Sequence, residues 1–151
     1  MKYIAYGSNM VKEQMAWRCP DARLIGMGYL EGARLEFYLH ATVEHTDSTR
    51  DRVPVAVWEI SERDETNLDR YEGVAGGYYG KEIWPVTMDD GSQIEGLIYI
   101  MKIIRHSPPV AGYYKSIRDA YSELGLRSKI RTVLEPALKR FAFSRLRAYP
   151  A

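Results

Sequence analysis

The sequence predicts a mixed α+β domain. Three observations support this class: short apolar segments that alternate like strands, segments with helical periodicity, and a hairpin signal at Asp89–Ser92. Read in order, the segments give β-α-β-β-β-α-β-β-α-α. A chain of 151 residues buries about 70% of its extended surface around one core, so residues 1–151 are expected to form a single domain.

The first half of the chain alternates between strand and helix patterns. Polar and glycine-containing stretches separate the apolar ones, and Pro20 helps to end the first helix. The expected elements are a strand at 3–6, a helix at 11–19, strands within 23–40, a loop at 44–52 and a strand at 53–60.

The helix expected over Ser61–Tyr71 has signals at both ends. Ser61 is the predicted N-cap, and Asp64 three residues later gives a shortened capping-box pattern. Gly73 is the natural stop at the other end, because glycine readily adopts the left-handed conformation that terminates helices. Residue 72 is therefore expected to lie where the helix ends.

Glu72 is the candidate general acid/base. Glu65, Asp69 and Glu72 fall at i, i+4 and i+7, which is usual for a solvated helix face. Glu72 differs because it lies at the helix end among apolar and aromatic neighbours: Tyr71, Val74, Tyr78 and Tyr79. Burial raises the pKa of a carboxyl group toward neutral pH, where the group can accept and return a proton.

The second half of the chain predicts a hairpin followed by helices. Strands are expected at 78–88 and 94–104. The next helix has apolar residues at helical spacing and stops at Gly125; these residues are Tyr113, Ile117, Ala120 and Leu124. A last helix over 128–142 contains Pro136, which must kink or split it. Its basic residues are expected to form a solvated face: Lys139, Arg140, Arg145 and Arg147.

A loop near the N-terminus is a candidate anion site. The first strand runs into Gly7, which permits unusual backbone conformations, and into Ser8 and Asn9, which are helix-capping residue types. Such a strand–loop–helix corner leaves backbone N–H groups free to bind an anion or an oxyanion. Taken alone, the segment is more typical of an ordinary capped turn.

Three motifs, taken together, resemble the γ-glutamylcyclotransferase family in the broad sense that includes its bacterial relatives. The first motif is Tyr6-Gly7-Ser8-Asn9-Met10. The second is Leu68-Asp69-x-Tyr71-Glu72-Gly73-Val74, with Tyr78 or Tyr79 after it. The third is Ser107-Pro108-Pro109, followed by Tyr113 and by Gly125-Leu126. In this order the motifs cover roughly residues 3 to 126.

The resemblance implies a small mixed β-barrel or sheet flanked by helices. It also implies that the backbone at Gly7, Ser8 and Asn9 holds a γ-glutamyl group, that Glu72 is the catalytic acid/base, and that Tyr113 helps to line the pocket. The other expected substrate-binding residues are Tyr6, Met10, Tyr78 and Tyr79.

The implied reaction is cyclotransfer on a small-molecule γ-glutamyl amide. The α-amine attacks the γ-carbonyl of the same molecule, which releases 5-oxoproline and an amine or amino acid and requires no metal or cofactor. Two departures leave the leaving group open: Val110 stands where many members carry a small polar residue, and Ala120-Tyr121 replaces a Gly-Ala pair.

The composition argues against several kinds of partner. A formal charge of +1 gives no reason to expect nucleic acid, and no apolar run approaches the 18 residues of a membrane span. Cys19 is the only cysteine, so an intramolecular disulfide is impossible, and a cytoplasmic location is expected. Twelve tyrosines against three phenylalanines suit either a polar ligand pocket or a half-buried β surface. The oligomeric state is not readable.

Other functions stay open at this stage. Ser8 could serve an amide hydrolase with His40 or His106 as base, although Gly7-Ser8-Asn9 is not the Gly-x-Ser-x-Gly pattern. A non-catalytic module could keep the pocket to bind a small ligand. His40 and His45 lie at i, i+5 rather than at the i, i+4 spacing of a zinc helix, so no metal site is expected.

Overall fold

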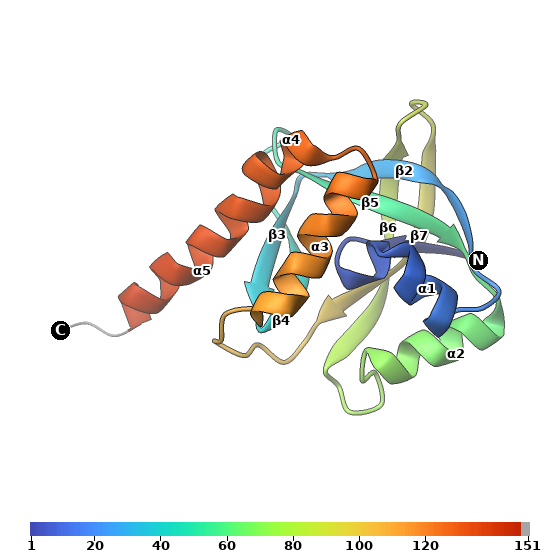
Figure 1. Ribbon diagram of the computed structural model, residues 1–151, viewed down its shortest axis with the longest axis horizontal. Helices are drawn as coiled ribbons and strands as arrows, with labels where there is room; N and C mark the ends of the chain where they lie inside the picture. The colour runs from blue at the N-terminus through green and yellow to red at the C-terminus, as the bar shows by residue number, and fades with distance from the viewer. Residues whose placement is uncertain (149–151) are drawn as a thin grey trace.

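The fold is a closed barrel of five strands with helices packed around it (Figure 1). The computed structural model describes the backbone of residues 1–148 and the side chains of residues 1–141. The barrel strands, in spatial order, are β1 (Lys2–Ala5), β5 (Arg52–Glu59), β2 (Arg23–Glu31), β6 (Tyr79–Met88) and β7 (Gln93–Met101). Neighbours are antiparallel except β1 and β7, which close the barrel in parallel. This confirms the predicted α+β class.

A separate hairpin lies beside the barrel. It consists of β3 (Ala33–Tyr38) and β4 (His40–His45), which pair only with each other in the sheet. The expected loop at 44–52 is wrong at both ends, because Glu44 and His45 belong to β4 and Arg52 begins β5. Glu44 and His45 are exposed, and exposed polar strand ends lack the apolar alternation that sequence patterns detect.

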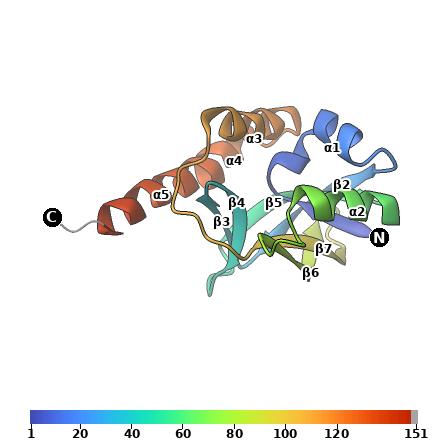
Figure 2. The ribbon, with the colours of Figure 1, turned by 90° about the horizontal axis from the view of Figure 1, so that it is seen from below.

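The helices cover the barrel on one side and extend beyond it (Figures 1 and 2). In chain order they are a 3₁₀ turn η1 (Ser8–Met10), α1 (Lys12–Arg18), α2 (Glu62–Tyr71), α3 (Ala111–Glu123), α4 (Arg127–Lys129), a π-helical segment η2 (Ile130–Leu134) and α5 (Glu135–Ala148). The core is continuous from the barrel interior to α3 and the start of α5, and includes Ile4, Leu68, Ile98, Ile117 and Leu134.

The local signals around α2 and the last helix operate as predicted. Ser61 and Asp64 form a reciprocal capping box, and Gly73 has a positive φ of 63° just after the helix. The last helix is interrupted immediately before Pro136 by η2, which confirms the expected break. Pro136 has no backbone N–H group that could donate a hydrogen bond to the carbonyl one turn earlier. The wider π-helical turn of η2 precedes it.

Two boundary expectations are corrected by the structure. β7 ends at Met101 rather than at 104, because Ile103 and Ile104 leave the barrel and are more than two-fifths exposed. Arg140 does not lie on a solvated face, since its guanidinium donates to Oε1 of Glu36 at 3.1 Å and to the carbonyl of Leu35. Lys139 is exposed, and the side chains of Arg145 and Arg147 lie outside the described residues.

Candidate active site

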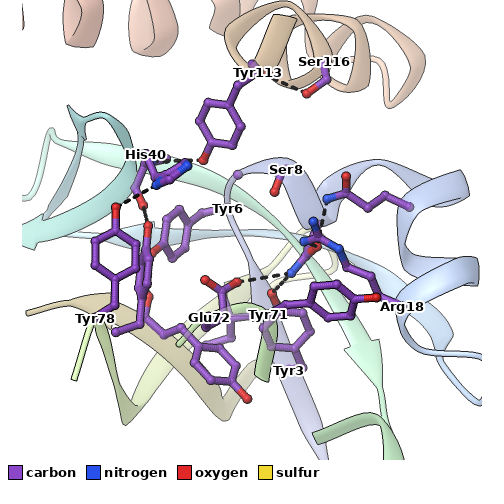
Figure 3. Close-up of a pocket in the computed structure, with 17 residues that line it drawn as sticks. Tyr3, Tyr6, Ser8, Arg18, His40, Tyr71, Glu72, Tyr78, Tyr113 and Ser116 are labelled. Atoms are coloured by element: carbon purple, nitrogen blue, oxygen red, sulfur yellow. Dashed lines mark hydrogen bonds between the residues drawn. The ribbon is translucent and has the colours of Figure 1, made fainter. Parts of the chain in front are cut away.

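A cavity of about 300 Å³ opens where the two strongest sequence motifs meet (Figure 3). It lies between η1, the end of α2, the start of β4 and the first turns of α3. Seven of the twelve tyrosines line it: Tyr3, Tyr6, Tyr71, Tyr78, Tyr79, Tyr99 and Tyr113. The tyrosine excess of the sequence is therefore concentrated around a cavity whose walls combine aromatic rings with many polar groups, including the phenol hydroxyls.

Glu72 points into this cavity from the end of α2 (Figure 3). It is the residue immediately after the helix, and Gly73 then turns the chain away. Burial raises the pKa of the Glu72 carboxyl to about 7, and the nearby Arg18 guanidinium partly opposes that rise. A carboxyl group with this pKa is present in both protonation states at neutral pH, as an acid/base must be.

The side-chain amide of Asn9 is held by four partners. Its Oδ1 accepts from Gln14 Nε2 at 3.1 Å and from Arg18 Nη1 at 2.9 Å. Its Nδ2 donates to the Tyr3 hydroxyl at 2.8 Å and reaches Oε1 of Glu72 at 3.5 Å. The buried amide therefore uses its full capacity to join η1, α1, β1 and the catalytic candidate.

The loop from Gly7 to Asn9 borders the cavity on another side. In the described part of the chain, the N–H groups of Ser8 and Asn9 donate to no backbone oxygen. A Cβ added at Gly7 would lie 3.4 Å from that of Ala41 and 3.6 Å from the Tyr113 hydroxyl, so a longer side chain would enter the cavity. Glycine thus keeps this wall open.

Three tyrosines are fixed by hydrogen bonds to the backbone. Tyr6 donates to the carbonyl of Tyr99 at 2.5 Å, and Tyr79 donates to that of Ala41 at 2.6 Å. Tyr113 accepts from the N–H of Ala41 at 3.0 Å, which leaves its own proton available for another acceptor. Burial raises the pKa of all three phenols above the ordinary value, so they remain neutral donors.

His40 and Tyr78 form a pair on the wall opposite Arg18 (Figure 3). His40 Nδ1 lies 2.7 Å from the Tyr78 hydroxyl, and its ring packs edge-on against Tyr113. Burial lowers the pKa of His40, and the Arg105 guanidinium lowers it further, so the imidazole is neutral at pH 7. The hydrogen bond between Nδ1 and the Tyr78 hydroxyl fixes the orientation of the imidazole, and the tautomer of His40 sets which of the two groups donates.

The structure brings most of the predicted site residues together. The predicted residues that line the cavity are Tyr6, Gly7, Ser8, Asn9, Glu72, Tyr78, Tyr79 and Tyr113. Met10 does not line it, because its side chain is buried in the core. Sequence reasoning missed Arg18, Gln14 and Ser116, and it considered His40 only as a metal ligand or hydrolase base. Gln14 and Arg18 belong to the short helix that begins directly after the first motif, which is the signal that could have found them.

The rival nucleophiles have poor surroundings. The Ser8 hydroxyl lines the cavity, but within the described residues it makes no hydrogen bond to a histidine, and His106 packs instead on Tyr38. Cys19 is buried outside the cavity, and burial raises the pKa of its thiol to about 12. No group of three or more potential metal ligands occurs among residues 1–141. Over the same residues, the helices are too short or too polar to cross a membrane.

Comparisons with known proteins agree on one family. The family described as "Gamma-glutamyl cyclotransferase, AIG2-like" matches residues 3–116. Gamma-glutamylcyclotransferase of Homo sapiens is 29% identical over 134 residues, which cover 82% of this chain and 71% of the relative. The Mus musculus enzyme is 28% identical over 143 residues, covering 88% and 76%. A solved structure named gamma-glutamyl cyclotransferase superposes with a TM-score of 0.78 at 27% identity, covering 87% of this chain and 84% of that one.

Proposed function

Because the chain belongs to the gamma-glutamyl cyclotransferase, AIG2-like family and is an enzyme of the cyclotransferase type, we propose that it cyclises a γ-glutamyl amide. The products are 5-oxoproline and the freed amine or amino acid. The observation that carries this proposal is the Glu72 carboxyl, whose pKa is raised to about 7 in a tyrosine-lined cavity.

The cavity contributes first by holding the substrate in a curled conformation. The α-amine of a γ-glutamyl group is four bonds from the γ-carbonyl carbon, so the substrate carries its own nucleophile. Fixing the two in contact contributes up to roughly 7–11 kcal/mol in intramolecular reactions. The enclosed part of the cavity, with its fixed rings of Tyr6, Tyr79 and Tyr113, is suited to this task.

Glu72 supplies the proton transfers. As a carboxylate it takes a proton from the α-amine while the amine nitrogen bonds to the γ-carbonyl carbon. The bond from that carbon to the leaving nitrogen then breaks, and Glu72 returns the proton to the leaving nitrogen. One group thus serves as base and then as acid, and no covalent enzyme intermediate is formed.

The loop at Gly7, Ser8 and Asn9 holds negative charge. The N–H groups of Ser8 and Asn9 have no backbone acceptor in the described residues, so they are available to the α-carboxylate or the developing oxyanion. One oxyanion donor contributes about 2.7–4 kcal/mol in acyl-transfer enzymes. Removal of the side chain at Ser8 should therefore matter less than a change in the backbone course at Gly7.

The proposed reaction is tested by identifying the product. Purified protein is incubated with γ-glutamyl amino acids, γ-glutamyl amines and glutathione, and 5-oxoproline and glutamate are quantified by mass spectrometry. Release of 5-oxoproline is the expected result, and the productive substrates report the leaving group. Release of glutamate instead would favour the Ser8 amide hydrolase. Binding without any release would favour the non-catalytic module.

A further inference from the structure

Two large aromatic side chains lie exposed beside the mouth of the cavity. Trp17 is 75% exposed and Tyr71 is 45% exposed, and the two rings adjoin each other rather than being scattered singly over the surface. Tyr71 lines the cavity, and the Trp17 ring packs against it with centroids 6.2 Å apart and a 55° tilt. An uncovered aromatic surface is thus continuous with the pocket.

Arg18 stands between this aromatic surface and the interior of the cavity. Its Cζ lies 4.4 Å from the centroid of the Tyr71 ring, and its Nη1 donates to Asn9 Oδ1. The side chain is partly buried, and within the described residues it has no carboxylate partner. A guanidinium has five N–H donors in a planar fork, so donors remain for a carboxylate from outside the protein.

The position of Arg18 relative to Glu72 indicates which part of the substrate can bind Arg18. The amide of Asn9 touches Arg18 through its oxygen and approaches Glu72 through its nitrogen. The guanidinium and the carboxyl group therefore lie at the two ends of one amide group (Figure 3). In an amino-acid leaving group, the carboxylate carbon is two bonds from the nitrogen that Glu72 protonates. This short separation is comparable to the gap between Arg18 and Glu72, which the single Asn9 amide bridges.

We propose that Trp17, Arg18 and Tyr71 form the leaving-group subsite, and that it accepts amino acids with a flat aromatic side chain. Arg18 binds the carboxylate of the leaving amino acid, and the aromatic ring packs on Trp17 and Tyr71. This inference rests on the cyclotransfer proposed above and names the substrate class for it.

The glutamyl part of the substrate belongs elsewhere in the cavity. Tyr3, Tyr6 and Tyr99 are each less than 10% exposed, which suits the portion of the substrate that must be enclosed and curled. The N–H groups of Ser8 and Asn9, which have no backbone acceptor in the described part of the chain, offer that portion its own anion site. The exposed rim is left for the group that departs to solvent.

Four substrates distinguish the contribution of the aromatic ring from that of the carboxylate. γ-Glutamyl phenylalanine and γ-glutamyl alanine differ in the ring, and the corresponding amides of phenethylamine and ethylamine lack the carboxylate. The wild type is expected to show kcat/KM about tenfold higher with the ring than without it, and about tenfold higher with the carboxylate than without it. Trp17→Ala should remove the ring preference, and Arg18→Gln the carboxylate preference. Ile83→Ala, an exposed apolar change outside the cavity, should keep both.

The ratios distinguish this proposal from damage to the enzyme and from failure of the reaction itself. Wild-type ratios near one, or ratios that Trp17→Ala leaves unchanged, would overturn the aromatic subsite. Arg18→Gln also acts on Glu72 and is expected to lower turnover on all four substrates, so the ratio carries the test. A variant that keeps the wild-type preference for the carboxylate-bearing substrates would contradict the role of Arg18 in the leaving-group subsite. Absence of 5-oxoproline from all four substrates would contradict the proposed function, and the subsite with it.

Discussion

The side-chain amide of Asn9 lies 3.5 Å from Oε1 of Glu72, although 63 positions separate the two residues in the chain. Asn9 belongs to the turn after β1, and Glu72 directly follows the last residue of α2. Their approach joins the proposed anion-binding loop to the proposed acid/base in one hydrogen-bonded group. The four partners of the Asn9 amide, including Arg18 and Tyr3, hold that group in place.

Asn9→Ala is expected to impair both activity and stability. The change removes the hydrogen bonds that the Asn9 amide makes with the buried Tyr3 hydroxyl and with Nη1 of Arg18. Their loss is expected to lower the unfolding free energy by about 1–3 kcal/mol. Turnover should fall by roughly 10²-fold, because Glu72 loses its positioning contact. Urea unfolding and 5-oxoproline release measure the two effects. Gln14→Ala, which removes only one bond to Asn9, should have a smaller effect, and equal effects would argue against a central role for Asn9.

Arg18→Gln should shift the pH dependence of the reaction upward. In the proposed reaction the carboxylate form of Glu72 acts first as base, so kcat/KM is expected to rise with pH through about 7 in the wild type. The Arg18 guanidinium lowers the pKa of Glu72, so removing its charge moves the midpoint of that rise to higher pH. Arg23→Gln, a change to an exposed arginine outside the cavity, should leave the midpoint in place. If the midpoint in Arg18→Gln equals that of the wild type, the charge of Arg18 does not influence the pKa of Glu72.

Glu72→Gln should increase stability at neutral pH but not at acidic pH. The pKa of Glu72 in the folded protein, about 7, exceeds its reference value of 4.5, so folding favours the protonated form. The stabilisation by that proton is complete below about pH 4.5 and is lost as pH rises to about 7. The variant keeps a neutral side chain throughout, so its advantage in melting temperature should grow over this range, by about 2–4 °C for each kcal/mol. A difference that does not vary with pH would contradict the raised pKa.

Tyr121→Phe is expected to stabilise the protein. Tyr121 is fully buried in α3, and its hydroxyl has no hydrogen-bond partner among the described residues. Removing an unpaired buried hydroxyl while keeping the ring should raise the unfolding free energy by about 1 kcal/mol, as measured in urea. Tyr6→Phe is the matched control, because that hydroxyl donates to Tyr99 and its loss should lower stability. Destabilisation by Tyr121→Phe would indicate an acceptor for the hydroxyl.

Local signals in the sequence were sufficient for the elements that carry Glu72. The capping pair Ser61 and Asp64 and the stop at Gly73 act within a few residues of each other, so their consequences are readable without tertiary structure. The interruption before Pro136 is equally local, because it follows from a missing N–H group.

Features that depend on distant partners could not be predicted in this way. The parallel pairing of β1 with β7 closes the barrel, but it joins Tyr3 to Leu97 and leaves no mark in either segment. In the sequence, Arg18 is an ordinary basic residue at the end of a helix. Its contacts with Asn9 and Tyr71 form only in the folded protein. His40 is held in the cavity wall by its hydrogen bond with Tyr78, which is 38 positions away in the chain.

The most direct test of the account is turnover by Glu72→Gln. With a γ-glutamyl substrate identified by 5-oxoproline release, we expect kcat to fall by about 10²–10⁴, because the amide keeps the shape of the carboxyl group but cannot exchange the proton. Calorimetry should give a Kd for the same substrate close to that of the wild type. Turnover near the wild-type rate would contradict the central claim, since Glu72 would then take no part in proton transfer.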